Sequence, residues 1–180
     1  MKRLIISAMF VMIAAAASAQ TIFPEFPLRG QTSSAQRAYL GVGDGQFSVA
    51  DVKGEYVVIQ AFSMYCPICQ RDAPRVNEAY QMIQKQGLGD KVKFLGVGVG
   101  NTAFEVVFYA RKYEVPFPLF MDDDFSVNDL LQVSGTPTYY VVKLDNGRPV
   151  TVGSRVGELD EPGDLVTLIK ESMNPEKGAS

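Results

Sequence analysis

The chain has 180 residues, with 17 lysines and arginines against 20 aspartates and glutamates, and it contains no histidine. Its net charge of -3 argues against nucleic acid and anionic membrane surfaces as partners, because both select basic proteins. The lack of histidine excludes Ser-His and Cys-His nucleophilic catalysis and removes the most common transition-metal ligand. Any chemistry must therefore rest on cysteine and carboxylate side chains.

Residues 1–19 have the pattern of a secretory signal peptide. Lys2 and Arg3 precede an apolar run, and the segment ends in an Ala-Ser-Ala cleavage pattern. The apolar run is shorter than the roughly 20 residues that span a bilayer, which disfavours the alternative of a retained membrane anchor. We therefore expect a periplasmic or otherwise extracytoplasmic protein that is soluble after cleavage of the signal peptide.

The rest of the chain has the size of one domain with its own core. Residues 20–46 are rich in Pro, Gly, Ser and Gln and show little periodicity, so we expect an extended N-terminal arm with at most a small hairpin. Residues 47–174 are predicted to form the folded domain. Residues 175–180 are predicted to be a polar tail.

Within the domain, strand and helix patterns alternate along the chain. The predicted elements are a strand at 55–62, a helix from Cys66 to the glycines at 87 and 89, a strand at 91–99, a helix at 103–113, a strand at 117–121, a helix at 125–132, strands at 139–144 and 149–156, and a helix at 161–173. The alternation predicts an α/β protein whose sheet is partly parallel. An Asp-Asn-Gly-Arg turn at 145–148 predicts a hairpin between the last two strands.

The chain has two cysteines, Cys66 and Cys69, and they follow the predicted strand at 55–62. Three chemistries suit a Cys-x-x-Cys pair: a metal site, a structural disulfide and a redox pair. A structural zinc site needs four ligands, and the chain offers two thiolates and no imidazole. A structural disulfide that closes so small a loop constrains little of the unfolded chain. These arguments favour a redox pair.

Local structure gives the redox interpretation a physical basis. A helix that begins at Cys66 directs its unpaired N–H groups and its dipole at the sulfur, which favours the thiolate. Such placement lowers a thiol pKa from about 8.5 to a range of about 3.5 to 7.5. Pro67 suits the first helical turn because it has no N–H to lose, and Cys69 lies one turn deeper, where it can resolve a mixed disulfide. We expect a redox-active Cys66–Cys69 disulfide, with no cofactor and no metal.

The segment AFSMYCPICQRDAP at residues 61–74 resembles the active site of the thioredoxin superfamily, and is nearest to its extracytoplasmic TlpA/ResA-like branch. Tyr65 supplies an aromatic residue before Cys-Pro-x-Cys, and Asp72 lies three residues after the second cysteine. The sequence GTPT at residues 135–138 resembles the family's Gly-x-Pro-Thr strand, whose proline is cis and faces the disulfide. This resemblance implies a thioredoxin-like fold, in which helices flank a central mixed β-sheet.

The resemblance also implies an activity, a thiol-disulfide oxidoreductase that reduces protein disulfides, with cytochrome c maturation as one role. Cys66 would attack the client disulfide and Cys69 would resolve the mixed disulfide. Asp72 would help to move the Cys69 proton, because Gln60 stands where thioredoxins carry a buried acid. The alternative for Asp72 is an exposed helix-surface position.

The partners that the resemblance implies are client proteins with thiols or disulfides and a membrane-bound redox partner. The residues expected to contact a client are Tyr65, Pro67, Thr136 and Pro137.

Two alternative functions remain open. Ser63-Met64-Tyr65-Cys66 also resembles the Thr/Ser-x-x-Cys of peroxiredoxins, which would make Cys66 a peroxidatic thiol, although Ile59 replaces the proline of those enzymes. The other is a binding module that keeps the thioredoxin fold without catalysis. The direction of electron flow depends on the reduction potential, which no residue pattern determines.

Overall fold

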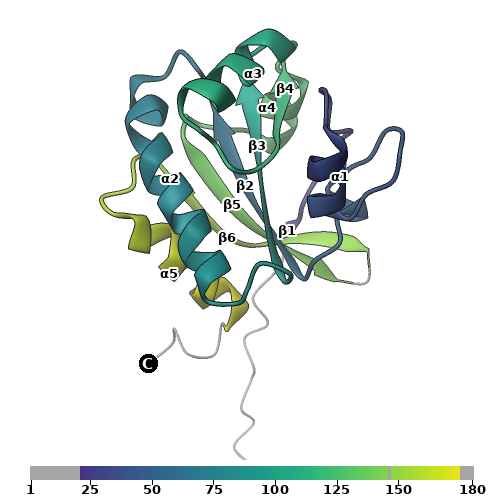
Figure 1. The fold of residues 1–180 in the computed structure, drawn as a ribbon, viewed down its shortest axis with the longest axis vertical. Helices are drawn as coiled ribbons and strands as arrows, with labels where there is room; N and C mark the ends of the chain where they lie inside the picture. Colours follow the sequence, from purple (N-terminus) through teal and green to yellow (C-terminus); the bar gives the residue numbers. More distant parts are fainter. Residues whose placement is uncertain (1–20, 146, 175–180) are drawn as a thin grey trace, which may run out of the picture.

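A six-stranded β-sheet forms the centre of the molecule, and helices cover both of its faces (Figure 1). The computed structural model describes residues 21–145 and 147–174. The predicted leader, residues 1–19, and the predicted polar tail, residues 175–180, lie outside the described residues.

The strands are β1 (Thr21–Ile22), β2 (Tyr56–Phe62), β3 (Val92–Val99), β4 (Leu119–Asp122), β5 (Thr138–Asp145) and β6 (Arg148–Val156). The helices are α1 (Ser34–Leu40), the short 3-10 helix η1 (Val49–Asp51), α2 (Pro67–Lys85), α3 (Ala103–Lys112), α4 (Ser126–Leu131) and α5 (Pro162–Met173). Each strand and helix predicted from residue 55 onward is found, with bounds that differ by a few residues at most. Among the described helices, none is long and apolar enough to cross a membrane.

The sheet is mixed, with the strand order β1-β6-β5-β2-β3-β4. Strands β2, β3 and β4 are parallel, whereas β5 is antiparallel to both β2 and β6. Strand β2 is buried along its whole length, as expected for a central strand with a continuous apolar sequence. The predicted central mixed sheet flanked by helices, the thioredoxin-like fold, is confirmed.

Two cores lie on opposite faces of the sheet, because alternate residues of each strand point to opposite sides. Helices α2, α3 and α5 cover one face, where their apolar side chains pack against Val58 and Phe62 of β2. The other face is covered by α1, α4 and the segment before α1, which pack against Val57 and Ile59. The carboxyl end of β2 leads directly into the cysteine loop, so a rigid central strand positions the site.

The segment 20–46 differs from the predicted extended arm, because it contains helix α1. Ser33 caps this helix by accepting a hydrogen bond from the Gln36 N–H, and the Gln36 side chain accepts one from the Ser33 N–H. Gly41 ends the helix in the left-handed conformation, with φ of 68°. Four apolar side chains of the segment are buried in the core: Phe23, Phe26, Leu28 and Leu40. The segment therefore packs as part of the domain's structure.

Candidate active site

Helix α2 begins at Cys66, and this places the first cysteine sulfur at the amino end of a helix. Cys66 is the N-cap residue, and its Sγ accepts a hydrogen bond from the Cys69 N–H at 3.4 Å. Pro67 takes the first helical position, where its missing N–H costs nothing. The Cys66 N–H donates to the Ser63 carbonyl at 3.1 Å, which fixes the turn before the helix. The predicted start of this helix is confirmed.

The two cysteines have opposite environments. Cys66 is half-buried, whereas Cys69 is fully buried beneath it, and both are free thiols. Partial burial raises the pKa of the Cys66 thiol, but hydrogen bonds, led by the one from the Cys69 N–H, outweigh it and hold the pKa below its ordinary value. Deeper burial raises the pKa of Cys69 to about 12. Cys66 is thus the thiol that ionises at the lower pH, and Cys69 remains a protonated thiol near neutral pH.

The GTPT segment reaches the cysteines from the opposite side, just before β5. The Cys66 thiol donates a hydrogen bond to the Thr136 carbonyl at 3.2 Å. The Thr136–Pro137 peptide bond is cis, and Pro137 is buried, with its carbonyl accepting a hydrogen bond from the Gly157 N–H at 2.8 Å. Two segments 70 residues apart in the sequence therefore meet at the Cys66 sulfur.

Tyr65 extends into solvent beside the nucleophile. Its side chain is 65 % exposed, and its hydroxyl donates a hydrogen bond to Glu105 of α3. The other Glu105 oxygen accepts hydrogen bonds from the Thr102 N–H, at 2.7 Å, and from the Thr102 hydroxyl, at 2.9 Å. Glu105 thus closes the capping box of α3 and holds Tyr65 with the same carboxylate.

Asp72 lies fully buried on α2, so the alternative of an exposed helix-surface position is wrong. Its carboxylate accepts hydrogen bonds from the Tyr139 hydroxyl at 2.7 Å and from the Leu159 N–H at 3.0 Å. Arg75 lies 3.3 Å from one oxygen, and Glu158 lies 3.3 Å from the same guanidinium nitrogen. Burial of this carboxylate is tolerated because each oxygen has a donor.

No hydrogen bond joins Asp72 to Cys69 within the described residues, although the two lie three positions apart on one helix. The Tyr139 hydroxyl donates a hydrogen bond to Asp72 at 2.7 Å. Burial raises the pKa of this hydroxyl most, followed by the hydrogen bond to Asp72, and the Cys69 sulfur adds to the rise. A catalytic role for Asp72 stays a prediction, and Tyr139 is the group through which it would act.

Gln60 lies on β2, the strand that leads into the cysteine loop, and is 4 % exposed. It lies opposite Tyr139 in the β2–β5 register, and its buried Nε2 atom has no hydrogen-bond partner among the described residues. An amide side chain cannot accept the proton of Cys69. The buried acid of this site is Asp72, which comes from helix α2 instead of strand β2.

Three supporting residues were not identified from the sequence: Asn101, Glu105 and Tyr139. Asn101 is fully buried, and its Oδ1 accepts a hydrogen bond from the Met64 N–H at 2.8 Å, which holds the cysteine loop. The Gln70 side chain donates to the Met64 carbonyl from the other side, at 2.7 Å. The Thr-x-x-Glu pattern at 102–105 signals a capping box, but nothing local signals the contact with Tyr65.

The profile of the AhpC/TSA family matches residues 21–147. The chain belongs to the AhpC/TSA family. Its matched region runs from β1 to the end of β5 and includes both cysteines, Asp72 and the GTPT segment. Membership agrees with the thioredoxin-like fold described above.

Among curated proteins, the chain is 30% identical over 94 residues to the thiol-disulfide oxidoreductase ResA of Geobacillus thermodenitrificans, covering 52% of each chain. It is 27% identical over 125 residues to ResA of Bacillus subtilis, covering 69% of this chain and 67% of that protein. The chain thus spans about half the length of the first of these relatives and two thirds of the second. The predicted resemblance to the TlpA/ResA-like branch is confirmed, as a distant one.

Among solved structures, the fold resembles that of a thiol:disulfide interchange protein of the thioredoxin family from Chlorobium tepidum. The TM-score is 0.63 at 20% identity, over 88% of this chain and the whole of that one. At this identity the likeness shows the fold alone.

Proposed function

We propose that the protein is an extracytoplasmic thiol-disulfide oxidoreductase that reduces protein disulfides with its Cys-Pro-Ile-Cys motif. The observation that carries the proposal is the contrast between the two thiols at the start of α2. Cys66 is accessible and has a lowered pKa, whereas Cys69 is buried behind it and has a raised one. The distant relatives named thiol-disulfide oxidoreductase support the same activity.

In the proposed reaction, the Cys66 thiolate attacks one sulfur of a client disulfide. A mixed disulfide forms, and the other client sulfur leaves as a thiolate that takes a proton from solvent. Cys69 then loses its proton and attacks the Cys66 sulfur, which releases the second client thiol and leaves a Cys66–Cys69 disulfide. Two electrons pass from the protein dithiol to the client disulfide in each cycle.

The second step must overcome the raised pKa of Cys69, about 12, because a thiol attacks poorly without losing its proton. In this proposal the Asp72 carboxylate assists that deprotonation, through the Tyr139 hydroxyl that contacts it at 2.7 Å. Arg75 forms an ion pair with Asp72, and Glu158 holds the Arg75 guanidinium by a second ion pair.

The client chain would lie across Tyr65 and Pro67, which flank Cys66 in the sequence, and across Thr136 and Pro137. Pro67 and Tyr65 are exposed, and the Thr136 carbonyl already faces the sulfur at 3.2 Å. An extended client segment would pair with this backbone in the manner of an added strand. A membrane-bound reductant would restore the dithiol, and cytochrome c maturation is one process that needs such a reductant. The leader pattern at residues 1–19 supports an extracytoplasmic location.

Insulin reduction by the chain without residues 1–19 tests the proposal. We expect turnover with a thiol reductant that exceeds the reductant alone, and loss of turnover in Cys66→Ala. No turnover would favour the non-catalytic binding module. The reduction potential, measured against glutathione buffers, decides direction: related motifs range from about -270 to -120 mV, and a value near the oxidising end would overturn the reductase assignment.

The family match keeps a thiol peroxidase as the second candidate, because Ser63 stands three residues before Cys66 in the peroxiredoxin-like pattern. In that reaction the Cys66 thiolate would attack a peroxide oxygen, release water or an alcohol, and become a sulfenic acid. Cys69 would then condense with it to form the disulfide and release water. Consumption of hydrogen peroxide at a rate above that of insulin reduction would favour this candidate.

A further inference from the structure

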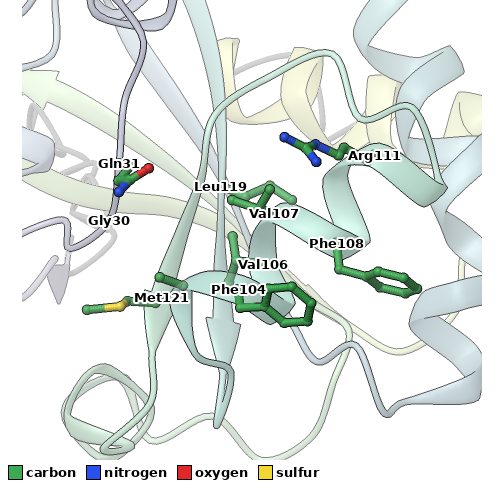
Figure 2. A pocket seen from close by; sticks show the side chains of 10 residues that line it. Gly30, Gln31, Phe104, Val106, Val107, Phe108, Arg111, Leu119 and Met121 are labelled. Atoms are coloured by element: carbon green, nitrogen blue, oxygen red, sulfur yellow. The ribbon is translucent and has the colours of Figure 1, made fainter.

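Helix α3 carries an apolar stripe on the side that faces solvent, beside a hollow of about 390 Å³ (Figure 2). The hollow lies between α3 and the edge strand β4, and Gly30 and Gln31 of the N-terminal segment form its third side. We call this surface the α3 groove. Its side-chain lining includes Phe104, Val107, Phe108 and Arg111 of α3 and Leu119 and Met121 of β4.

The stripe is the second apolar face of its helix. Positions 104, 107, 108 and 111 follow the spacing of a single helix face. Phe104 is 78 % exposed and Phe108 is 47 % exposed, whereas Tyr109 on the opposite face is buried in the core. A surface helix normally has one apolar face, and packing against the sheet already satisfies that need. Exposed aromatic side chains on the other face mark a surface for a partner.

The groove has an uncompensated positive charge. Arg111 is the charged residue of its lining, and its guanidinium extends toward the side formed by Gln31 (Figure 2). It has no ion pair with any residue in the described ranges 21–145 and 147–174. By contrast, Arg71 and Arg75 near the cysteines are both paired with Glu158. A partner that complements the groove therefore offers a carboxylate next to apolar side chains.

The groove lies on the same helix that contacts the residue before Cys66. Glu105, the neighbour of Phe104, holds the Tyr65 hydroxyl, and Tyr65 directly precedes Cys66. From Phe104 the stripe runs along α3 to Arg111, a distance of about 10 Å at 1.5 Å per residue. A polypeptide bound at Cys66 can therefore continue past Tyr65 into the groove.

We propose that the α3 groove is a docking site for an apolar, acid-bearing segment of the client polypeptide, near in sequence to the client cysteine. This proposal rests on the proposed oxidoreductase function. The apolar side chains of the segment pack on Phe104 and Phe108, and its carboxylate pairs with Arg111. Clients that carry such a segment are reduced faster than clients that lack it, since docking raises their local concentration at Cys66.

Synthetic peptide disulfides test the proposal. Each peptide contains one cysteine, a Gly/Ser spacer and a Leu-Phe-Glu, Leu-Phe-Gln or Leu-Phe-Lys end, and is used as its disulfide-linked dimer. Spacers of about two, five and eight residues sample different separations between the Cys66 sulfur and the α3 groove, because an extended chain spans about 3.3 Å per residue. The Cys69→Ala protein gives the single-turnover rate, since Cys66 attack releases one peptide thiol and retains the other as a mixed disulfide.

At low salt, we expect the Glu peptide to react about fivefold faster than the Gln peptide at the best spacer length, as expected for one partly exposed ion pair. Arg111→Gln should remove this preference, and Arg111→Glu should transfer it to the Lys peptide. Arg148→Gln, the same change on the distant β5–β6 hairpin, should retain the preference for Glu. Added salt should reduce the preference, because an exposed ion pair is screened.

The other outcomes separate this proposal from the one on which it rests. If no peptide dimer reacts with Cys66, the proposed oxidoreductase function fails. If all peptides react equally and Arg111→Glu changes no preference, docking is refuted while the activity stands. Self-association of the protein that Phe108→Ser abolishes would assign the groove to a second copy of the chain, and would also overturn the proposal.

Discussion

Helices α2 and α3 pack against the same face of the sheet. They differ in whether their charged and exposed side chains have partners within the protein. Around α2, the carboxylate of Asp72 and the guanidinium groups of Arg71 and Arg75 all have partners within the structure. Along the outer side of α3, Phe104 and Arg111 have none among the described residues. A network satisfied internally is suited to fixing reactive groups, whereas unsatisfied groups are suited to binding another molecule. Variants on the two helices test this division of roles.

The largest effect is expected at the two cysteines of α2. Cys66→Ala should abolish exchange and trap no client, because the buried sulfur of Cys69 cannot reach one. Cys69→Ala should instead accumulate a covalent mixed disulfide through Cys66. Mass spectrometry of the two variants after incubation with a disulfide client measures both outcomes, and a client adduct on Cys69 would contradict the assignment.

The pH dependence of alkylation should separate the two thiols. Since the pKa of Cys66 is lowered, its thiolate fraction rises with pH and reaches one half at a lower pH than in an ordinary thiol. Cys69, with a pKa of about 12, should remain unmodified near neutral pH. Iodoacetamide rates over a pH series, with Cys69→Ala for Cys66 and Cys66→Ala for Cys69, give both titrations. Equal rates at pH 7 would show that the environments are not different.

Asp72→Asn tests the buried network of α2 for both stability and catalysis. The amide retains the shape but presents a donor to the Leu159 N–H or the Tyr139 hydroxyl, so we expect a loss of about 1–3 kcal/mol in the free energy of unfolding. The resolving step should slow by about tenfold, less than the ~100-fold of a base in direct contact, because Asp72 has no hydrogen bond to Cys69.

Denaturant unfolding and single-turnover exchange measure these two effects separately. Tyr139→Phe is the matched variant, because it removes the hydroxyl and keeps the carboxylate. If Asp72 acts through this hydroxyl, Tyr139→Phe should also slow resolution while the first attack stays unchanged. An unchanged Cys69 titration and unchanged rates in Asp72→Asn would make Asp72 a residue of the fold alone.

The smallest effect is expected at the contact between the two regions, where Tyr65 meets Glu105. Tyr65→Phe keeps the ring beside Cys66 but removes the hydrogen bond, and at this exposed position the cost in unfolding free energy should be within about 0.5 kcal/mol. The KM for insulin should rise modestly, by about twofold, with kcat unchanged, because a less fixed ring binds client more weakly. A change in kcat alone would place Tyr65 in the chemical step instead.

The features of the site that the sequence predicts are those that depend on residues close together in the chain. The start of α2 at Cys66 follows from a strand end, a proline at the first helical position and an apolar helical pattern, all of them neighbours in the sequence. The pairing of GTPT with the cysteines came from family resemblance, because nothing near Cys66 indicates a partner 70 residues away.

The parts that could not be predicted depend on contacts between distant residues. The sequence gives Asp72 the same pattern as a solvated helix residue, and its burial arises from donors 67 and 87 residues further along. The segment 20–46 shows little periodicity, yet Phe23 and Phe26 pack against each other in the core, with ring centroids 5.8 Å apart. The predicted strand at 117–121 begins later, at Leu119, since Pro118 has no N–H to donate and takes part through its carbonyl.

The N-terminal segment pairs with part of the strand at each end of the sheet. Thr21 and Ile22 pair with β6 near one edge, and the Arg29 carbonyl accepts a hydrogen bond from the Met121 N–H at the opposite edge, at 2.9 Å. Ion pairs from Arg29 to Asp123 and Asp124 hold the second attachment. Exposed strand edges are templates for aggregation. One continuous stretch before α1 thus occupies backbone pairing groups at both sides of the sheet, and its release would expose them together.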